Sequence, residues 1–202
     1  MNSHNWKKHW NNNFEDYRND LERDYIIFNM MDNEKNKNKN ILDIGCAKGE
    51  LLSFLKKRGF MNLWGIDFSK EMIDICRHNK IENVSVQDAE RIYYKDNSFD
   101  IIIASGLIEY LKEDNKFIEE CKRLLKNNGI LIISYRNSLF SKWSEKEYDT
   151  KRRTHNPIGI NYYGFKTVKS MFFHKHYPSK GLNNKFRHSA FISMFVKEKQ
   201  NE

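Results

Sequence analysis

Residues 40–58 contain the feature that most constrains the fold of this chain, an apolar segment that leads through a glycine-rich turn into a helix. Segment 40–45 has the length and composition of a short buried strand, and residues 50–58 carry leucines at helical spacing. Glycines allow a tight turn and let a ligand approach the backbone closely. The first turn of the helix offers free N–H groups. This unit is typical of an open α/β sheet, in which ligands bind at the carboxyl ends of the strands.

The alternation of strands and helices continues through the middle of the chain. Further strands are expected at residues 63–67, 84–86, 99–104 and 130–134. Ser69 is expected to cap a helix that follows the second strand, and an amphipathic helix is expected at 114–126, before the fifth. Strands that alternate with helices form parallel sheets. The sequence therefore predicts an α/β fold, a Rossmann-like three-layer sandwich with a mostly parallel central sheet and helices on both faces.

The two ends of the chain have a less regular pattern. Trp10, Phe14 and Tyr17 recur at helical spacing, which predicts a helix over much of residues 5–30. Residues 136–163 are interpreted as a long connection. After it the pattern favours a helix at 163–174 and then a C-terminal strand at 190–196, which is expected to be antiparallel.

Composition favours a soluble globular protein. Hydrophobic residues make up 39% and charged residues 31% of the 202 residues, and no stretch approaches the roughly 18 uncharged apolar residues of a membrane span. Cys46, Cys76 and Cys121 form no Cys-x-x-Cys pair, which argues against disulfides and zinc and favours the reducing cytoplasm. The net charge of +8 is concentrated in residues 135–202, which hold 14 Lys and Arg against 5 Asp and Glu. Such a basic region attracts an anionic substrate, a nucleic acid or a membrane surface, or is a solvated face.

The glycine-rich turn does not match two common nucleotide-binding patterns. Gly49 is followed by Glu50, whereas a Walker loop requires Gly-Lys-Ser or Gly-Lys-Thr. A dinucleotide fingerprint that starts at Gly45 requires glycine where the chain has Ala47 and Glu50. What remains is an acid, Asp43, followed by Gly45 and Gly49 with the small Ala47 between them.

Two further acids complete this pattern. Asp67 ends the second expected strand, about 20 residues after the turn, as the acid of a ribose site does. Asp88 and Ala89 follow the third expected strand. In order and spacing these elements resemble the class I S-adenosylmethionine-dependent methyltransferases of the small-molecule type. Residues 41–136 carry the resemblance, and Ala47 stands where the family more often has glycine.

The resemblance implies S-adenosylmethionine as the cofactor and assigns residues to its parts. In the family, the acid at the position of Asp67 binds the ribose hydroxyls. The acid at the position of Asp88 binds the adenine amino group, and the next backbone N–H, here that of Ala89, meets a ring nitrogen. An N-terminal Tyr or Arg, here Tyr17 or Arg18, lies near the cofactor carboxylate. No metal is expected, and the expected cofactor-binding residues are Asp43, Gly45, Cys46, Ala47, Gly49, Asp67, Phe68, Asp88, Ala89, Ser105 and Tyr17.

The resemblance also divides the single expected domain, 1–202, into functional parts. Residues 1–32 are an N-terminal helical lid segment, which either closes over the cofactor or simply packs on the core. Residues 41–136 are the cofactor-binding core. Residues 137–202 are expected to supply an acceptor-side loop, a helix and the C-terminal strand.

Methyl transfer requires the acceptor atom and the electrophilic methyl group to be held in line, away from water. A general base is needed only for a weak nucleophile such as a hydroxyl. His155 is the candidate base, with Tyr110, Tyr162 and Tyr163 as further groups near the expected mouth of the site. The connection that contains His155 is rich in basic and aromatic residues and is expected to form the acceptor pocket.

The expected acceptor is a small molecule, and the basic pocket favours an anionic one. Two alternatives remain open at this stage. A nucleic-acid (RNA) methyltransferase would use the basic C-terminal third, although the Asn/Asp-Pro-Pro-aromatic motif of base-amino methyltransferases is missing after the fourth strand, where residues 105–108 stand. A non-catalytic binding module of the same fold is the other alternative. Either a monomer or a homodimer is compatible with the sequence.

Overall fold

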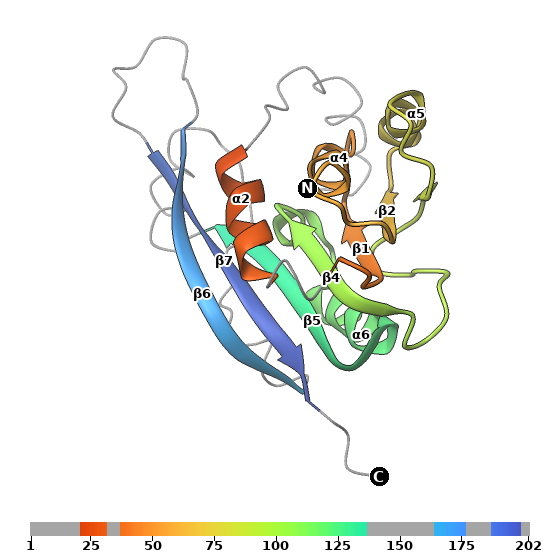
Figure 1. Ribbon diagram of the computed structural model, residues 1–202. Coiled ribbons are helices and arrows are strands. Elements are labelled where there is room, and N and C mark those ends of the chain that lie inside the picture. Colours follow the sequence, from red (N-terminus) through yellow and green to blue (C-terminus); the bar gives the residue numbers. More distant parts are fainter. Residues whose placement is uncertain (1–20, 32–36, 137–163, 177–186, 199–202) are drawn as a thin grey trace.

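A seven-stranded sheet forms the centre of the protein (Figure 1). The computed structural model describes residues 21–31, 37–136, 164–176 and 187–198. The strands are β1 (Ile41–Ile44), β2 (Leu63–Asp67), β3 (Val84–Val86), β4 (Phe99–Ser105), β5 (Leu125–Arg136), β6 (Phe165–His176) and β7 (Arg187–Lys197). Their order is β3-β2-β1-β4-β5-β7-β6. Strands β1 to β5 pair in parallel, and β7 is antiparallel to both of its neighbours. The predicted mostly parallel sheet with an antiparallel C-terminal strand is confirmed.

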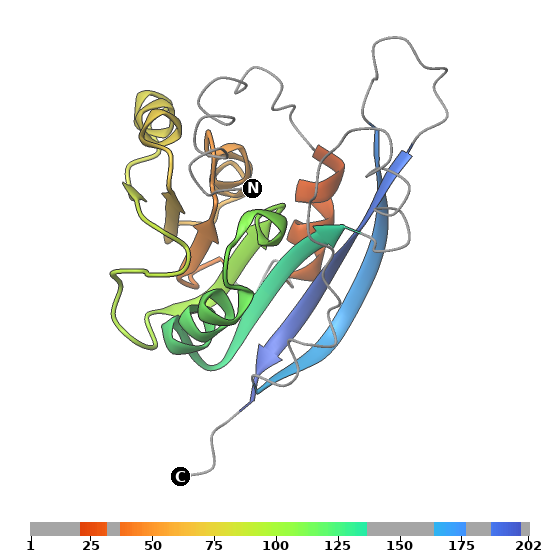
Figure 2. The same cartoon turned by 180° about the vertical axis from the view of Figure 1, so that it is seen from behind.

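Helices cover both faces of the sheet (Figures 1 and 2). The helices α2 (Leu21–Met30), α4 (Glu50–Lys56) and α5 (Lys70–His78) pack on one face, and α6 (Asp114–Leu124) packs on the other. Alternate residues of β4 pack against the helices on opposite faces of the sheet. Ile101 and Ile103 join the apolar cluster under α4, whereas Ile102 and Ala104 join the cluster under α6. No helix in the described part of the chain is long and apolar enough to span a membrane.

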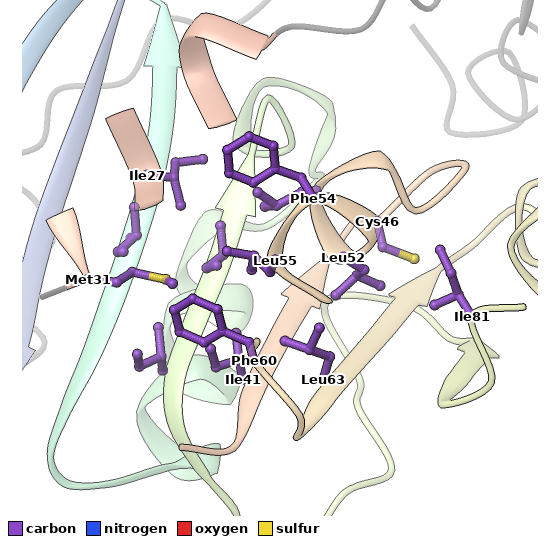
Figure 3. Packing of buried hydrophobic residues seen from close by; sticks show 14 of the residues in the cluster. Ile27, Met31, Ile41, Cys46, Leu52, Phe54, Leu55, Phe60, Leu63 and Ile81 are labelled. Atoms are coloured by element: carbon purple, nitrogen blue, oxygen red, sulfur yellow. The ribbon is translucent and has the colours of Figure 1, made fainter. Parts of the chain in front are cut away.

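The Arg58 guanidinium contacts aromatic rings of both α2 and α4. The Cζ atom of Arg58 lies 3.5 Å from the ring centroid of Phe54, 4.9 Å from that of Tyr25 and 5.2 Å from that of Phe28. A cation over an aromatic face is worth about 0.5–2 kcal/mol, depending on how far it is desolvated. Below this contact, buried aliphatic and aromatic side chains of the two helices and of β1 fill the same layer (Figure 3). The described part of the predicted N-terminal helix therefore packs on the core.

The predicted helix at 163–174 is wrong. Residues 165–176 form β6, which pairs with β7 from Phe165↔Lys197 to His176↔Arg187, with a bulge between Thr167 and Lys169. The segment is rich in aromatic residues, which suit a strand. The spacing of its apolar residues is also compatible with a helix. Pairing with β7 therefore determines that the segment forms a strand.

Strand β5 begins earlier than the sequence predicts. It was expected at 130–134, yet the strand starts at Leu125, which pairs with Phe99. The next pair is Ile101↔Ile130, so the extra residues on β5 form an irregularity in the ladder. Asn128 takes a φ of 60°, which asparagine tolerates better than most residues. The final strand predicted at 190–196 is confirmed and is longer, as β7.

Arg123 of α6 holds the loop between β3 and β4. Its guanidinium donates to the carbonyl oxygens of Ile92 and Tyr94, both at 2.8 Å, and to a carboxylate oxygen of Asp96 at 2.7 Å. Glu120 accepts from the same guanidinium at 2.8 Å and from the backbone N–H of Ile92, also at 2.8 Å. The loop is thereby tied to a helix on the far side of the sheet from α4.

Replacing Arg123 with methionine should lower the free energy of unfolding by about 1–3 kcal/mol, because two loop carbonyls lose a charged donor. Urea titration of the purified protein measures the change. Lys116→Met on the same helix is the matched control. It removes only an exposed ion pair with Glu113, and such pairs contribute little to stability. Equal effects of the two variants would contradict the structural role assigned to Arg123.

Candidate functional site

A cavity of about 280 Å³ opens at the carboxyl ends of β1, β2, β3 and β4. The sheet order reverses between β1 and β4, which lie side by side although β2 follows β1 in the chain. Ligands of open α/β sheets bind at such switch points. Seven of the residues predicted to bind the cofactor line this cavity: Gly45, Ala47, Asp67, Phe68, Asp88, Ala89 and Ser105.

The turn after β1 is built on left-handed backbone conformations. Gly45 has a φ of 76°, Ala47 of 47° and Gly49 of 77°. The φ of Gly49 strains any other residue, and a β-carbon there would lie 2.4 Å from Cδ1 of Ile81, whose side chain would have to move. Ala47 adopts a conformation that costs a non-glycine residue about 1–2 kcal/mol. Neighbouring contacts must therefore hold the turn in place.

The Asp67 carboxylate supplies such a contact. Its Oδ2 accepts the backbone N–H of Ala47 at 3.0 Å, and its Oδ1 accepts that of Ser69 at 2.9 Å. Burial raises the pKa of Asp67, and the backbone N–H bonds oppose the shift. Ser69 in turn caps α5, since its hydroxyl accepts the N–H of Met72 at 3.3 Å. Asp67 thus joins the β1 turn to the start of α5, and its carboxylate accepts a further backbone hydrogen bond from Phe68.

Glu90 joins two loops across the rim of the cavity. Its Oε1 accepts the backbone N–H of Lys112 at 2.6 Å and that of Glu113 at 3.0 Å. Asp88, which is exposed, accepts the N–H of Glu90 at 2.9 Å. The loop after β3 is therefore tied to the segment that follows β4.

Several lining residues were not predicted. Sequence reasoning did not identify Ile44, Ile66, Met72, Gln87, Glu90, Gly106, Leu107, Leu111 and Lys112 as part of the site. Most of them follow predicted residues by one to three positions, so the loop positions after each strand were the available signal. Tyr110, a candidate near the mouth of the site, also lines the cavity.

Three predicted residues do not line the large cavity. Gly49 caps α4, and the Cys46 side chain lies in the apolar layer between α4 and the sheet (Figure 3). The thiol of Cys76 donates to the carbonyl oxygen of Ala47 at 3.1 Å from below the turn. Asp43 is buried in β1 and lines a separate, small cavity of about 10 Å³.

Asp43 lies among charged groups from three elements. Arg23, on α2, is buried and donates to Oδ1 of Asp24 at 2.9 Å. Burial raises the pKa of Asp43 to about 7. The Arg23 guanidinium opposes this shift, and the carboxylates of Asp24, Asp67 and Glu50 add to it.

Five predicted or candidate residues lie outside the described part of the chain: Tyr17, Arg18, His155, Tyr162 and Tyr163. Their roles stay predictions. In the described segments, no group of three or more His, Cys, Asp or Glu side chains is placed to hold a metal ion.

Both a family model and curated proteins that match this chain are methyltransferases. Residues 42–133 match the family model of the methyltransferase domain. The chain is 31% identical over 112 residues to the ubiquinone biosynthesis O-methyltransferase of Coxiella burnetii, an alignment that covers 53% of this chain and 47% of that protein. The corresponding enzyme of Histophilus somni is 28% identical over 116 residues, covering 52% and 48%. The chain thus spans about half the length of the curated relatives it matches.

Solved structures share the fold. A S-adenosylmethionine-dependent methyltransferase of Methanosarcina mazei superposes with a TM-score of 0.68 at 18% identity, covering 85% of this chain and 98% of that one. A putative methyltransferase of Bacillus halodurans gives 0.68 at 16% identity, covering 89% and 99%.

Asp43 should make stability depend on pH. The pKa of Asp43 is about 3.9 in the unfolded chain and about 7 in the folded protein. Its contribution to the free energy of unfolding is therefore complete below about pH 3.9 and is lost as the pH rises toward about 7. Urea unfolding of the wild type from pH 4 to pH 7 should show a fall in the free energy of unfolding, with a slope of up to about 1.4 kcal/mol per pH unit from this group. In Asp43→Asn the free energy of unfolding should fall less steeply over the same pH range.

Asp74→Asn, an exposed change on α5, is the control and should keep the wild-type slope. An unchanged slope in Asp43→Asn would show that Asp43 ionises normally in the folded protein.

Proposed function

We propose that this chain, whose residues 42–133 match the family model of the methyltransferase domain, is a class I S-adenosylmethionine-dependent methyltransferase that transfers the methyl group of that cofactor to a small anionic molecule. The observation that carries the proposal is the cavity at the carboxyl ends of β1 to β4, with Gly45, Asp67 and Asp88 in its wall. Each of these residues comes from a different strand end.

The chemistry of the cavity wall fits an adenosine. Asp67 is a buried carboxylate at the end of β2, and a carboxylate accepts the hydrogen bonds that ribose hydroxyls donate. Asp88 is an acceptor suited to an exocyclic amino group. Ile66 and Met72 add apolar surface for a flat base. In this proposal, Gly45 and Ala47 bring the backbone of the turn close to the cofactor.

The bound cofactor supplies a methyl group that is already electrophilic. The chain's own task is to hold the acceptor atom in line with it and to keep water away. Leu107, Tyr110 and Leu111 line the cavity on the side of the loop after β4 and would form part of that enclosure. For a hydroxyl acceptor, His155 is the proposed base, and residues 135–163 are the proposed acceptor pocket.

One observation supports a small-molecule acceptor, and a second supports an anionic one. The relatives from Coxiella burnetii and Histophilus somni are named as O-methyltransferases of ubiquinone biosynthesis. The proposed pocket also carries Arg152 and Arg153, and arginine matches carboxylate and phosphate by bidentate hydrogen bonds.

Asp67→Asn tests cofactor binding. The change keeps the size of the side chain but places an amide NH₂ where the carboxylate accepts hydrogen bonds. Affinity for S-adenosylhomocysteine, measured by calorimetry, should fall by about 1–3 kcal/mol. Asp74→Asn, on the surface of α5, should bind as the wild type does. Wild-type affinity in Asp67→Asn would remove Asp67 from the binding site, and preferential binding of NAD or ATP by the wild type would overturn the proposed function.

The acceptor can be identified by incubating the protein with S-adenosylmethionine labelled on the methyl group and a fractionated metabolite extract or RNA. The label should appear in a small anionic product. With that acceptor in hand, the double variant Arg152→Ala/Arg153→Ala should raise its KM about tenfold or more, as expected when a bidentate charged contact is lost, and should leave cofactor affinity unchanged. Lys166→Ala/Lys169→Ala on the exposed edge of β6 is the control. Labelled RNA, or a neutral small product, would contradict this assignment.

A further inference from the structure

The loop between β3 and β4 begins with a turn that forms one wall of the large cavity. The cavity is lined there by Gln87, Asp88, Ala89 and Glu90. The backbone carbonyl oxygen of Asp88 accepts the N–H of Arg91 at 3.0 Å, and these two residues form an isolated antiparallel bridge. Inside the turn, Oδ1 of Asp88 accepts the N–H of Glu90 at 2.9 Å. No described residue donates a hydrogen bond to Oδ2, which leaves this oxygen for a ligand.

The side chain of Gln87 closes this turn. Its Oε1 accepts the backbone N–H of Tyr93 at 2.7 Å, and its Nε2 donates to Oγ of Ser85, also at 2.7 Å. A backbone N–H can only donate, so the amide oxygen must face Tyr93 and the NH₂ group must face Ser85. The backbone N–H of Gln87 donates to the carbonyl oxygen of Asp67 at 3.0 Å, which fixes the start of the turn on β2. One residue thus connects β2, β3 and the far side of the turn.

Hydrogen bonds, rather than packing, set the shape of this turn. Asp88 is exposed, and Tyr93 is 72% exposed. Among residues 87–93 only Ile92 is buried, and it is anchored on α6. A segment with few buried contacts opens easily, so the amide of Gln87 matters for its position. Loss of that amide would leave Asp88 less firmly placed relative to β3.

We propose that Gln87 is a positioning residue that holds the Asp88 carboxylate against the exocyclic amino group of the cofactor's adenine, and thereby makes the site selective for adenine over hypoxanthine. The two bases have nearly the same size, but hypoxanthine has a carbonyl oxygen where adenine has the amino group. A carboxylate accepts hydrogen bonds and donates none, so it attracts the amino group and repels the carbonyl oxygen. Such discrimination requires an acceptor that is held in place. The inference rests on the proposed function, which places adenosine in the large cavity.

Two ligands that differ in this group measure the selectivity directly. Calorimetry should show the wild type binding S-adenosylhomocysteine about 100-fold more tightly than S-inosylhomocysteine, because the second ligand leaves the carboxylate without a donor. Gln87→Met keeps the length of the side chain but removes both polar groups. In this variant the ratio should fall to about tenfold, mainly because S-adenosylhomocysteine binds more weakly. General loosening of the cavity would weaken both ligands equally and leave the ratio unchanged.

Three further variants make the test specific. Gln87→Glu keeps an oxygen for the Tyr93 N–H, and the Ser85 hydroxyl can turn to donate to the other oxygen, so the wild-type ratio should be retained. Asp88→Asn should lower the ratio by itself, because an amide offers both a donor and an acceptor. Adding Gln87→Met to Asp88→Asn should lower it no further, since Gln87 acts through Asp88.

Ser98→Ala is the matched control. It removes a hydroxyl that donates to the carbonyl oxygen of Lys95 at 2.6 Å in the same loop, away from the lining of the cavity. The ratio of the two affinities should stay at the wild-type value. If Gln87→Met does not fold, Gln87→Asn, which is too short to reach both partners, replaces it with the same expected loss.

A wild-type ratio in Gln87→Met would overturn the inference, as would a wild-type protein that binds the two ligands equally. A further fall of the ratio in the double variant would show that Gln87 acts independently of Asp88, which also contradicts it. If the wild-type protein binds neither ligand, the proposed function itself fails, which is a different result from any of these.

Discussion

The hydrogen bonds of the Asp67 carboxylate are the interaction on which the rest of the site depends. A turn with left-handed φ at Gly45, Ala47 and Gly49 is not stable by itself, least of all at Ala47. Asp67 compensates because one oxygen accepts the N–H of Ala47 and the other accepts that of Ser69. The same bonds satisfy a carboxylate that is nearly buried, which would otherwise be costly. The turn after β1 and the start of α5 are therefore positioned by one side chain at the end of β2.

The loops around the cavity are connected to the β1 turn by further contacts. A β-carbon on Gly45 would lie 3.2 Å from Cδ1 of Leu107, so the β1 turn and the loop after β4 are in close contact. That loop is connected through Glu90 to the loop after β3, which Arg123 holds onto α6. The rim of the site is held by charged side chains that reach across 22 to 31 positions of sequence.

Sequence reasoning succeeded where the decisive contacts are local. The strand, glycine turn and helix around Gly45 and Gly49, the strand ends at Asp67 and Asp88, and the apolar stripe of α6 can all be recognised from periodicity and from residues a few positions apart. It failed for β6, because pairing with β7 outweighs a pattern that also suits a helix. The start of β5 at Leu125 was missed for a similar reason, since it depends on pairing with Phe99. Glu90 and Arg123 have no local signature, because each acts on backbone groups that only the fold brings near.

The order of the strands has a consequence for how the protein is made. Strand β7 lies between β5 and β6, yet it comes after both of them in the sequence. During synthesis the ribosome releases β5 and then β6 before the strand that joins them exists. Until β7 emerges, β5 has an open edge and β6 has no partner in its own sheet, and unpaired edges are where nascent chains associate with one another. Completion of the described sheet therefore waits for residue 197, and from the translation of residue 176 until then both strands present edges on which nascent chains can associate.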